Sequence, residues 1–195
     1  MKLTIQHQER FSRGELILRT FLGWLYIAIP HFFLLFFVGI WSGIITFIAL
    51  LSILFTARYP QSMFEFQVGL MKWQLRLNAR IMNLADGYPA FGISGSDEST
   101  NLEVEYPDRL SRGLLIVKVL FGWLYVGIPH GFILFFRMIA TQVLAFLAWW
   151  VVLITAKYPE SFHEFVTGTI RWSYRVTLYM GLMSDDYPPF SGKEI

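Results

Sequence analysis

The sequence predicts an all-α membrane protein of two tandem repeats, each a transmembrane helical hairpin followed by a cytoplasmic interfacial amphipathic helix. Three observations predict this class. Of 195 residues, 55% are hydrophobic and only 15% are charged, whereas soluble domains carry about 25% charged residues. The sequence repeats itself at an offset of 99 residues. Each copy contains an apolar stretch that is long enough to cross a bilayer twice.

The duplication covers most of the chain. Residues 10–92 align with 109–191 without a gap, and 35 of these 83 positions are identical. This predicts a tandem duplication, because a solenoid would need more and shorter units. The expected organisation is an N-terminal tail (1–9), repeat unit one (10–92), an acidic, mobile linker (93–108), repeat unit two (109–191) and a C-terminal tail (192–195).

Each unit opens with basic residues and continues into an apolar stretch of some 40 residues, from Leu16 to Ala57 and from Leu114 to Ala156. Since about 20 helical residues cross the hydrocarbon core, two spans joined by a tight turn fit each stretch. We expect the turns near residues 39–43 and 137–142, which gives four transmembrane helices. Of the 16 Lys and Arg residues, 15 lie at the entries and exits of these hairpins or beyond them, and only Arg137 lies near a turn, so the positive-inside rule predicts cytoplasmic termini.

A helix is expected after each hairpin, from about residue 63 to 84 in unit one. Ser62 with Glu65, and Ser161 with Glu164, match a capping box. The alternation in WQLRLN (73–78) is typical of a strand, but an unpaired strand beside lipid would leave backbone groups unsatisfied, so we favour the helix. Two interpretations of its basic stripe are open, namely binding of anionic lipid headgroups and simple anchoring at the interface. The candidate interface residues are Arg58, Lys72, Arg76, Arg80, Lys157, Arg171 and Arg175.

Each unit closes with the pattern D-x-Y-P followed by an aromatic residue. Its side chains either dock onto the helix above or contact a partner protein. Arg137, near the expected turn of unit two, is a further candidate for partner contact or for reaching outer headgroups. The candidate partner contacts are Tyr88, Pro89, Phe91, Arg137, Tyr187, Pro188 and Phe190.

A proline and a histidine interrupt the first apolar segment of both units, as Pro30-His31 and Pro129-His130. Proline removes a helical hydrogen bond and predicts a kink. Three interpretations of the histidines are open. Each imidazole bonds a kinked backbone or a neighbouring helix, or the histidines handle protons on a small polar pathway, or the pair holds a haem or metal.

The composition argues against several function classes. No cysteine is present, which excludes thiolate catalysis and cysteine-ligated metals. A formal charge of +2 gives no reason to expect a nucleic-acid partner. Neither a glycine-rich phosphate loop nor a zinc-protease motif occurs, so we expect no enzymatic activity, no catalytic residues, no metal site and no obligatory cofactor.

The motifs R-x-S-R, I-P-H, Y-P-x-S-x-x-E-F, W-x-x-R and D-x-Y-P, which occur in both units, resemble the bacterial membrane family known as domain-of-unknown-function family 4389. The resemblance covers 10–92 and 109–191. It implies paired hydrophobic segments in each unit and a bacterial membrane location, which we expect to be the inner membrane, and it implies no activity. Two residues depart from the family pattern. In unit one Ala90 replaces the second proline of the closing motif, and in unit two Arg137 lies near the expected turn.

From these observations we expect a non-enzymatic, multi-pass accessory or scaffold subunit of a larger membrane complex, which contacts partner helices and anionic lipid. The glycines of the apolar stretches permit close helix approach, and the aromatic surface is large for four helices to cover alone. The alternatives are a homo-oligomeric transporter or channel with Pro-His kinks along its pathway, and a haem-binding subunit that uses His31 and His130.

Overall fold

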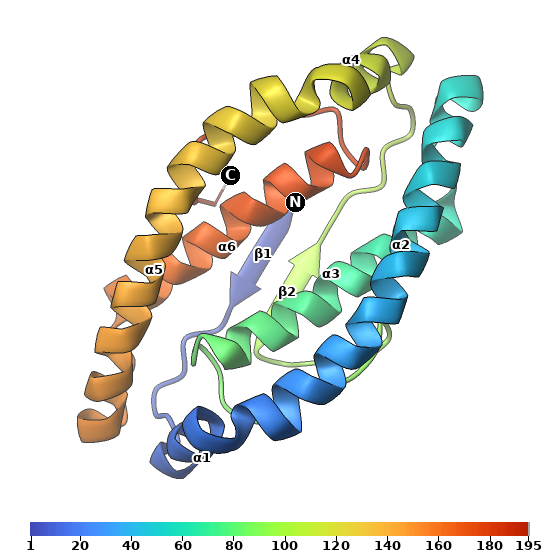
Figure 1. Cartoon of the computed structure of the whole chain (residues 1–195). Coiled ribbons are helices and arrows are strands. Elements are labelled where there is room, and N and C mark those ends of the chain that lie inside the picture. Colours follow the sequence, from blue (N-terminus) through green and yellow to red (C-terminus); the bar gives the residue numbers. More distant parts are fainter. Residues whose placement is uncertain (195) are drawn as a thin grey trace.

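The structure is a computed structural model that describes residues 1–194, and within them it is helical apart from two short strands (Figure 1). The first half of the chain contains β1 (Lys2–Ile5) in the N-terminal tail, followed in unit one by α1 (Arg13–Gly23), a π-helical segment (Trp24–Ala28), α2 (Ile29–Thr56) and α3 (Gln61–Ile81). The second half contains β2 (Thr100–Glu103) in the linker, followed in unit two by α4 (Arg112–Gly122), a second π-helical segment (Trp123–Gly127), α5 (Ile128–Thr155) and α6 (Glu160–Met180).

Each unit has one long apolar helix where the sequence predicted a hairpin. The helical backbone runs without a break over the 44 residues Arg13–Thr56 and again over Arg112–Thr155, and both helices are long and apolar enough to cross a membrane. The turns expected at residues 39–43 and 137–142 are wrong, because α2 and α5 continue through them. Glycine inside a helix costs only about 1 kcal/mol, which does not end the helix. In the continuous helices, Ser42 of α2 bonds Gln67 of α3 and Thr141 of α5 bonds Thr169 of α6.

The expected perturbation at proline takes the form of a π-helical turn. The backbone N–H of Ile29 bonds the Trp24 carbonyl, five residues earlier, and Pro30 follows in the first turn of α2. A π-turn widens the backbone at the point where the proline ring would crowd the Tyr26 carbonyl. Unit two repeats this arrangement at Trp123–Gly127. Figure 1 shows both long helices curving along the outside of the molecule.

The segment after each long helix is a helix, as the sequence predicted, and not a strand. The expected capping box is wrong, because α3 begins after Pro60 without a side-chain cap and Glu65 instead accepts from Gln61 Nε2 at 2.9 Å. Proline's fixed φ suits the start of a helix. The expected surface position of α3 also needs correction, since eleven of its 21 residues are buried and α6 is buried to the same extent.

Strands β1 and β2 lie where the two units meet. They pair antiparallel, with Leu3 opposite Leu102, two residues that are also equivalent under the 99-residue offset. A pseudo-twofold axis therefore passes between them. The expected N-terminal tail and acidic linker thus contain the strands that join the units.

The two units also exchange contacts at both ends of the long helices. The Phe11 N–H donates to the Ala156 carbonyl and the Leu110 N–H donates to the Ala57 carbonyl, each at 2.8 Å. Ala57 and Ala156 adopt left-handed φ angles of 60° and 59°, which end α2 and α5. Each unit therefore closes the helix terminus of the other.

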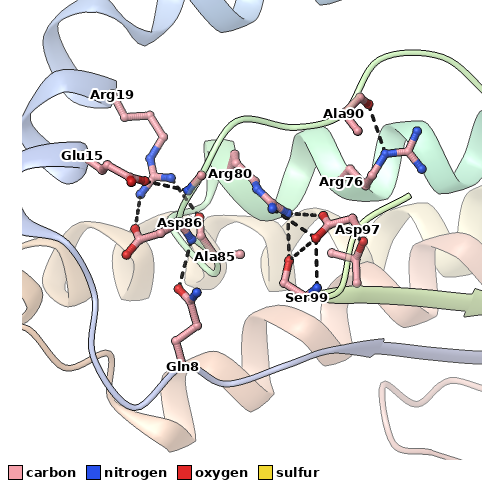
Figure 2. A network of polar contacts seen from close by, with 12 residues as sticks. Gln8, Glu15, Arg19, Arg76, Arg80, Ala85, Asp86, Ala90, Asp97 and Ser99 are labelled. Carbon is pink, nitrogen blue, oxygen red and sulfur yellow. Dashed lines mark hydrogen bonds and ion pairs between the residues drawn. The ribbon is translucent and has the colours of Figure 1, made fainter. Parts of the chain in front are cut away.

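The molecule has three layers. The long helices form an apolar layer, α3 and α6 pack under it, and β1 with β2 packs on the other side of α3 and α6. Figure 2 shows this order, with the ribbon of α1 and α2 above α3 and the strands below. The core lies mainly between these layers and includes Leu3, Leu75, Leu102, Val152 and Val166.

Candidate functional site

His31 lies at the centre of a buried aromatic cluster in unit one. Its side chain is fully buried, and its Nδ1 accepts a hydrogen bond from Trp73 Nε1 at 2.8 Å. The Phe91 ring stacks on the imidazole, with centroids 4.0 Å apart and planes 9° apart. The I-P-H, W-x-x-R and D-x-Y-P motifs thus meet at one place, contributed by α2, α3 and the segment after α3.

Unit two contains the same cluster. His130 is fully buried, Trp172 Nε1 donates to His130 Nδ1 at 2.9 Å, and Phe190 stacks on the imidazole at 4.0 Å and 7°. The two sites are therefore equivalent, and each is complete within its own repeat unit.

A tyrosine of the closing motif donates a hydrogen bond to the helix backbone near the proline. Pro30 has no N–H to give to the carbonyl four residues earlier, that of Tyr26. The Tyr88 hydroxyl donates to this carbonyl at 3.1 Å, and Tyr187 donates to the Tyr125 carbonyl at 3.0 Å in unit two. The closing motif therefore docks onto its own long helix, which is one of the two interpretations that the sequence left open.

The hydrogen bond from tryptophan fixes the histidine tautomer. A neutral imidazole has one donor and one acceptor nitrogen, so a histidine whose Nδ1 accepts carries its proton on Nε2. This N–H is buried and has no hydrogen-bond partner of normal geometry in either unit, although in unit one the Pro89 carbonyl is close enough to interact with the ring. Neither histidine offers a free lone pair, so this arrangement does not fit a haem or metal held between them.

Four arginines expected at lipid headgroups are buried and hold the chain that follows their helix. Arg76 donates to the carbonyls of Ala90, at 3.1 Å, and Gly92, and Arg80 pairs with Asp97 and Ser99 (Figure 2). The headgroup role expected for Arg76, Arg80, Arg171 and Arg175 is therefore wrong, because a guanidinium with several donors satisfies buried loop carbonyls.

Two arginines of unit two act in the same way, Arg175 as the counterpart of Arg76 and Arg171 at the position of Lys72. Arg175 donates to the Ser191 and Lys193 carbonyls. Arg171 donates to the carbonyls of Leu3, in the first strand, and Gly192. Arg171 thus also ties unit two to β1.

Asp97 is the main carboxylate in this network. Burial by itself would raise its pKa, but the Arg80 guanidinium and the hydrogen bonds from Ser99 hold the pKa of Asp97 below its usual value. Asp97 therefore stays ionised near neutral pH and gives Arg80 a charged partner.

Figure 2 also shows Arg19 at the start of the long helix, donating to the Ala85 carbonyl and Asp86. Lys118 takes this place in unit two and donates to the Ser184 carbonyl and to Asp185 at 2.8 Å. These contacts hold the first turns of each long helix against the residues that follow α3 or α6.

Arg137 contacts residues of its own unit. Its Nε donates to Thr169 Oγ1 at 2.9 Å, and its guanidinium lies over the Phe165 ring at 4.3 Å. Of the expected interface residues, Arg58, Lys72 and Lys157 are exposed.

Sequence reasoning missed a pair of histidines at the junction of the units. The His7 and His163 rings are perpendicular, with centroids 5.0 Å apart, and His7 Nε2 lies 2.7 Å from the Tyr158 carbonyl. The equivalent pair in the other half is Tyr106 and Phe64, whose rings are also in contact. The 99-residue offset, extended to residue 7, relates the two pairs. Burial, together with the nearby His7, lowers the pKa of His163 to about 4.

The comparison with known families agrees with the duplication. The family described as Domain of unknown function (DUF4389) matches residues 18–92 and again 116–192. No curated protein and no solved structure matches the chain.

Proposed function

Because the chain belongs to the DUF4389 family through both of its halves, we propose a shared role for the two repeats, that of a non-enzymatic accessory or scaffold subunit in a larger membrane assembly. We place it at the inner membrane of a bacterial cell, with both termini in the cytoplasm. In this role the long helices contact lipid and partner helices.

The observation that carries this proposal is the uncovered apolar surface of the long helices. Only 11% and 17% of their most apolar stretches are buried, and nineteen large apolar side chains are exposed on each helix. A soluble monomer exposes apolar patches of at most a few hundred Å². Hydrocarbon or partner helices must therefore cover this surface.

The geometry favours this role over the transport and haem alternatives. The histidines that would line a pathway are fully buried beneath Phe91 and Phe190. Each of them is held by its own tryptophan, so the paired motifs stabilise the repeat units. A rigid, internally fastened unit with a broad apolar surface suits a scaffold.

Affinity purification of the tagged full chain from solubilised membranes tests the proposal. We expect defined polypeptides to co-purify in constant ratio. Phe36→Ser and Phe135→Ser, which alter exposed side chains of the two long helices, should lose these polypeptides, whereas Lys72→Ser, on the exposed side of α3, should keep them. A chain that purifies alone and moves ions or solutes in liposomes would overturn the proposal.

A further inference from the structure

We infer that the two long helices lie in the plane of the membrane, embedded in one leaflet, and that neither crosses it. This inference rests on the proposed membrane role and specifies its geometry. Lipid covers the apolar surface of the long helices. The acyl chains of one leaflet contact the apolar layer, and anionic headgroups contact the basic residues at its two ends.

The first argument is length. No charged residue occurs between Arg19 and Arg58, over 38 residues, and at 1.5 Å per residue a helix of this length extends about 57 Å. A hydrocarbon core of about 30 Å would require a tilt of about 58°, beyond the usual limit of about 40°. A helix that lies in the membrane plane has no such mismatch.

The second argument is the position of the helix beneath. Ser42 on α2 bonds Gln67 on α3 at 2.7 Å, and His31 bonds Trp73 farther along both helices. α3 therefore runs beside the middle of α2. A crossing α2 would carry the exposed charges of Glu65 and Lys72 into the hydrocarbon, where an uncompensated charge costs several kcal/mol.

The third argument is the placement of the basic residues. Arg13 donates to the Ile154 carbonyl, near Lys157, at one end of the apolar layer, and Arg112 donates to the Phe55 carbonyl, near Arg58, at the other end. A crossing arrangement would divide these basic ends between the two sides of the membrane, without the asymmetry that sets orientation. An in-plane arrangement places both ends at the headgroups of one leaflet.

The opposite layer has a different charge. The second strand and the residues around it expose Glu98, Glu103 and Glu105, with Lys2 opposite Glu103. Carboxylates gain nothing from an anionic leaflet, so this face suits the aqueous side. Basic residues at the ends of the apolar layer and carboxylates on the sheet layer define one orientation.

Single cysteines in the full chain test the inference, since the natural chain has none. Gly14→Cys lies at the start of the first long helix, and Gln61→Cys lies just after its end, at the first residue of α3. Gly39→Cys marks the middle of the helix, where an added Cβ meets no atom within 4 Å. Gly113→Cys and Glu160→Cys are the matched end probes of unit two. Labelling uses an impermeant maleimide on spheroplasts and on inside-out vesicles.

We expect all four end probes to react from the cytoplasmic side and to show background reaction from the other side. A fluorophore on the Gly39→Cys variant should be quenched more by lipids brominated near the headgroup than by lipids brominated near the chain end. End probes of one helix on opposite sides would overturn the inference in favour of crossing helices. Reaction of Gly39→Cys from the outer side would overturn it in favour of a hairpin.

The same preparations separate this inference from the proposed function. End probes on opposite sides, or reaction of Gly39→Cys from the outer side, would contradict the in-plane geometry. If the chain also resists carbonate extraction, the membrane role stays intact. Release of the whole chain from membranes by carbonate would contradict the membrane role itself.

Discussion

At the scale of single residues, each buried histidine depends on one side-chain hydrogen bond within a cluster of aromatic rings. Trp73 gives His31 its only side-chain hydrogen bond, and Phe91 covers the ring. A buried imidazole without that donor would keep an unsatisfied lone pair, which costs more than a lost hydrogen bond on the surface. The tryptophan therefore permits a polar residue at this position.

Replacing this donor should destabilise the fold. We expect Trp73→Phe to lower the free energy of unfolding by about 1–3 kcal/mol, because the ring volume is mostly kept while the donor is lost. Trp172→Phe should have a similar effect in unit two. Thermal unfolding in detergent measures both. Trp24→Phe, at an exposed tryptophan, is the control and should change stability by less than about 0.5 kcal/mol.

His163 should make stability depend on pH. Its folded pKa of about 4 lies below the ordinary value of about 6.5, so the unfolded chain binds the proton more tightly. The contribution of neutral His163 to the free energy of unfolding is therefore fully present above pH 6.5. As the pH falls toward 4, the free energy of unfolding decreases by up to about 3 kcal/mol. Unfolding temperatures between pH 7 and 4.5 should fall accordingly.

The matched variant for this dependence is His163→Phe, which introduces the residue found at the equivalent position, Phe64. It should flatten the pH profile in this range. An unchanged slope would show that another group causes the dependence.

The sequence contained much of each cluster but not its assembly. The motifs with His31, Trp73 and Phe91 all recur at the same offset, which indicated that they matter, and docking of the closing motif was one of the expected alternatives. Their meeting could not be predicted, because it depends on how α3 and its trailing segment fold back along α2. Periodicity within one helix says nothing about that path.

At the scale of elements, the arginines of α3 and α6 act as internal fasteners. Arg76 and Arg175 donate to carbonyls of the segment that closes each unit. The stripe at helical spacing was visible in the sequence. Whether it faced headgroups or loop carbonyls was decided by the chain that covers it.

Removing one fastener should loosen the closing segment. We expect Arg76→Met to speed amide hydrogen exchange in residues 88–95 by about 10- to 100-fold, because hydrogen bonds to charged groups contribute about 1.5–3 kcal/mol. Lys72→Met, one turn earlier and exposed, is the control and should leave exchange there unchanged. Equal exchange in both variants would show that the aromatic docking alone holds the segment.

The long helices show which features of an element a sequence does not determine. Hydrophobic length predicted membrane contact, but some 40 apolar residues fit either a hairpin or one continuous helix. Gly39 and Gly43 have open space around them and do not interrupt α2. The deciding contacts are those of Ser42 with Gln67 on α3, and they depend on tertiary structure.

At the scale of the whole molecule, the duplication produces an intramolecular pseudo-dimer. Leu3 and Leu102 face each other across the axis, and each unit bonds the end of the other's long helix. The alignment from residue 10 onward predicted the repeat. It missed the strands because residues 2–5 and 101–104 share little sequence beyond one leucine.

The strand pairing should close within one chain. In the cysteine-free background, Lys2→Cys with Glu103→Cys places two thiols directly opposite each other on an exposed face, where Cβ atoms lie about 4.5–5.5 Å apart. We expect an intramolecular disulfide at every protein concentration. The unfolding temperature should rise, since closing a loop of about 100 residues restricts the unfolded chain.

Non-reducing electrophoresis and thermal unfolding measure this outcome. Lys2→Cys with Asn101→Cys is the out-of-register control, because Asn101 lies opposite Thr4; it should cross-link far less at equal exposure. Disulfide-linked dimers that increase with concentration would instead mean that β1 pairs with β2 of a second chain. The pseudo-twofold would then relate two molecules, and the reciprocal bonds at Ala57 and Ala156 would form between chains. A cross-link confined to the monomer would show that β1 and β2 of one chain pair with each other, so that both repeats belong to one molecule.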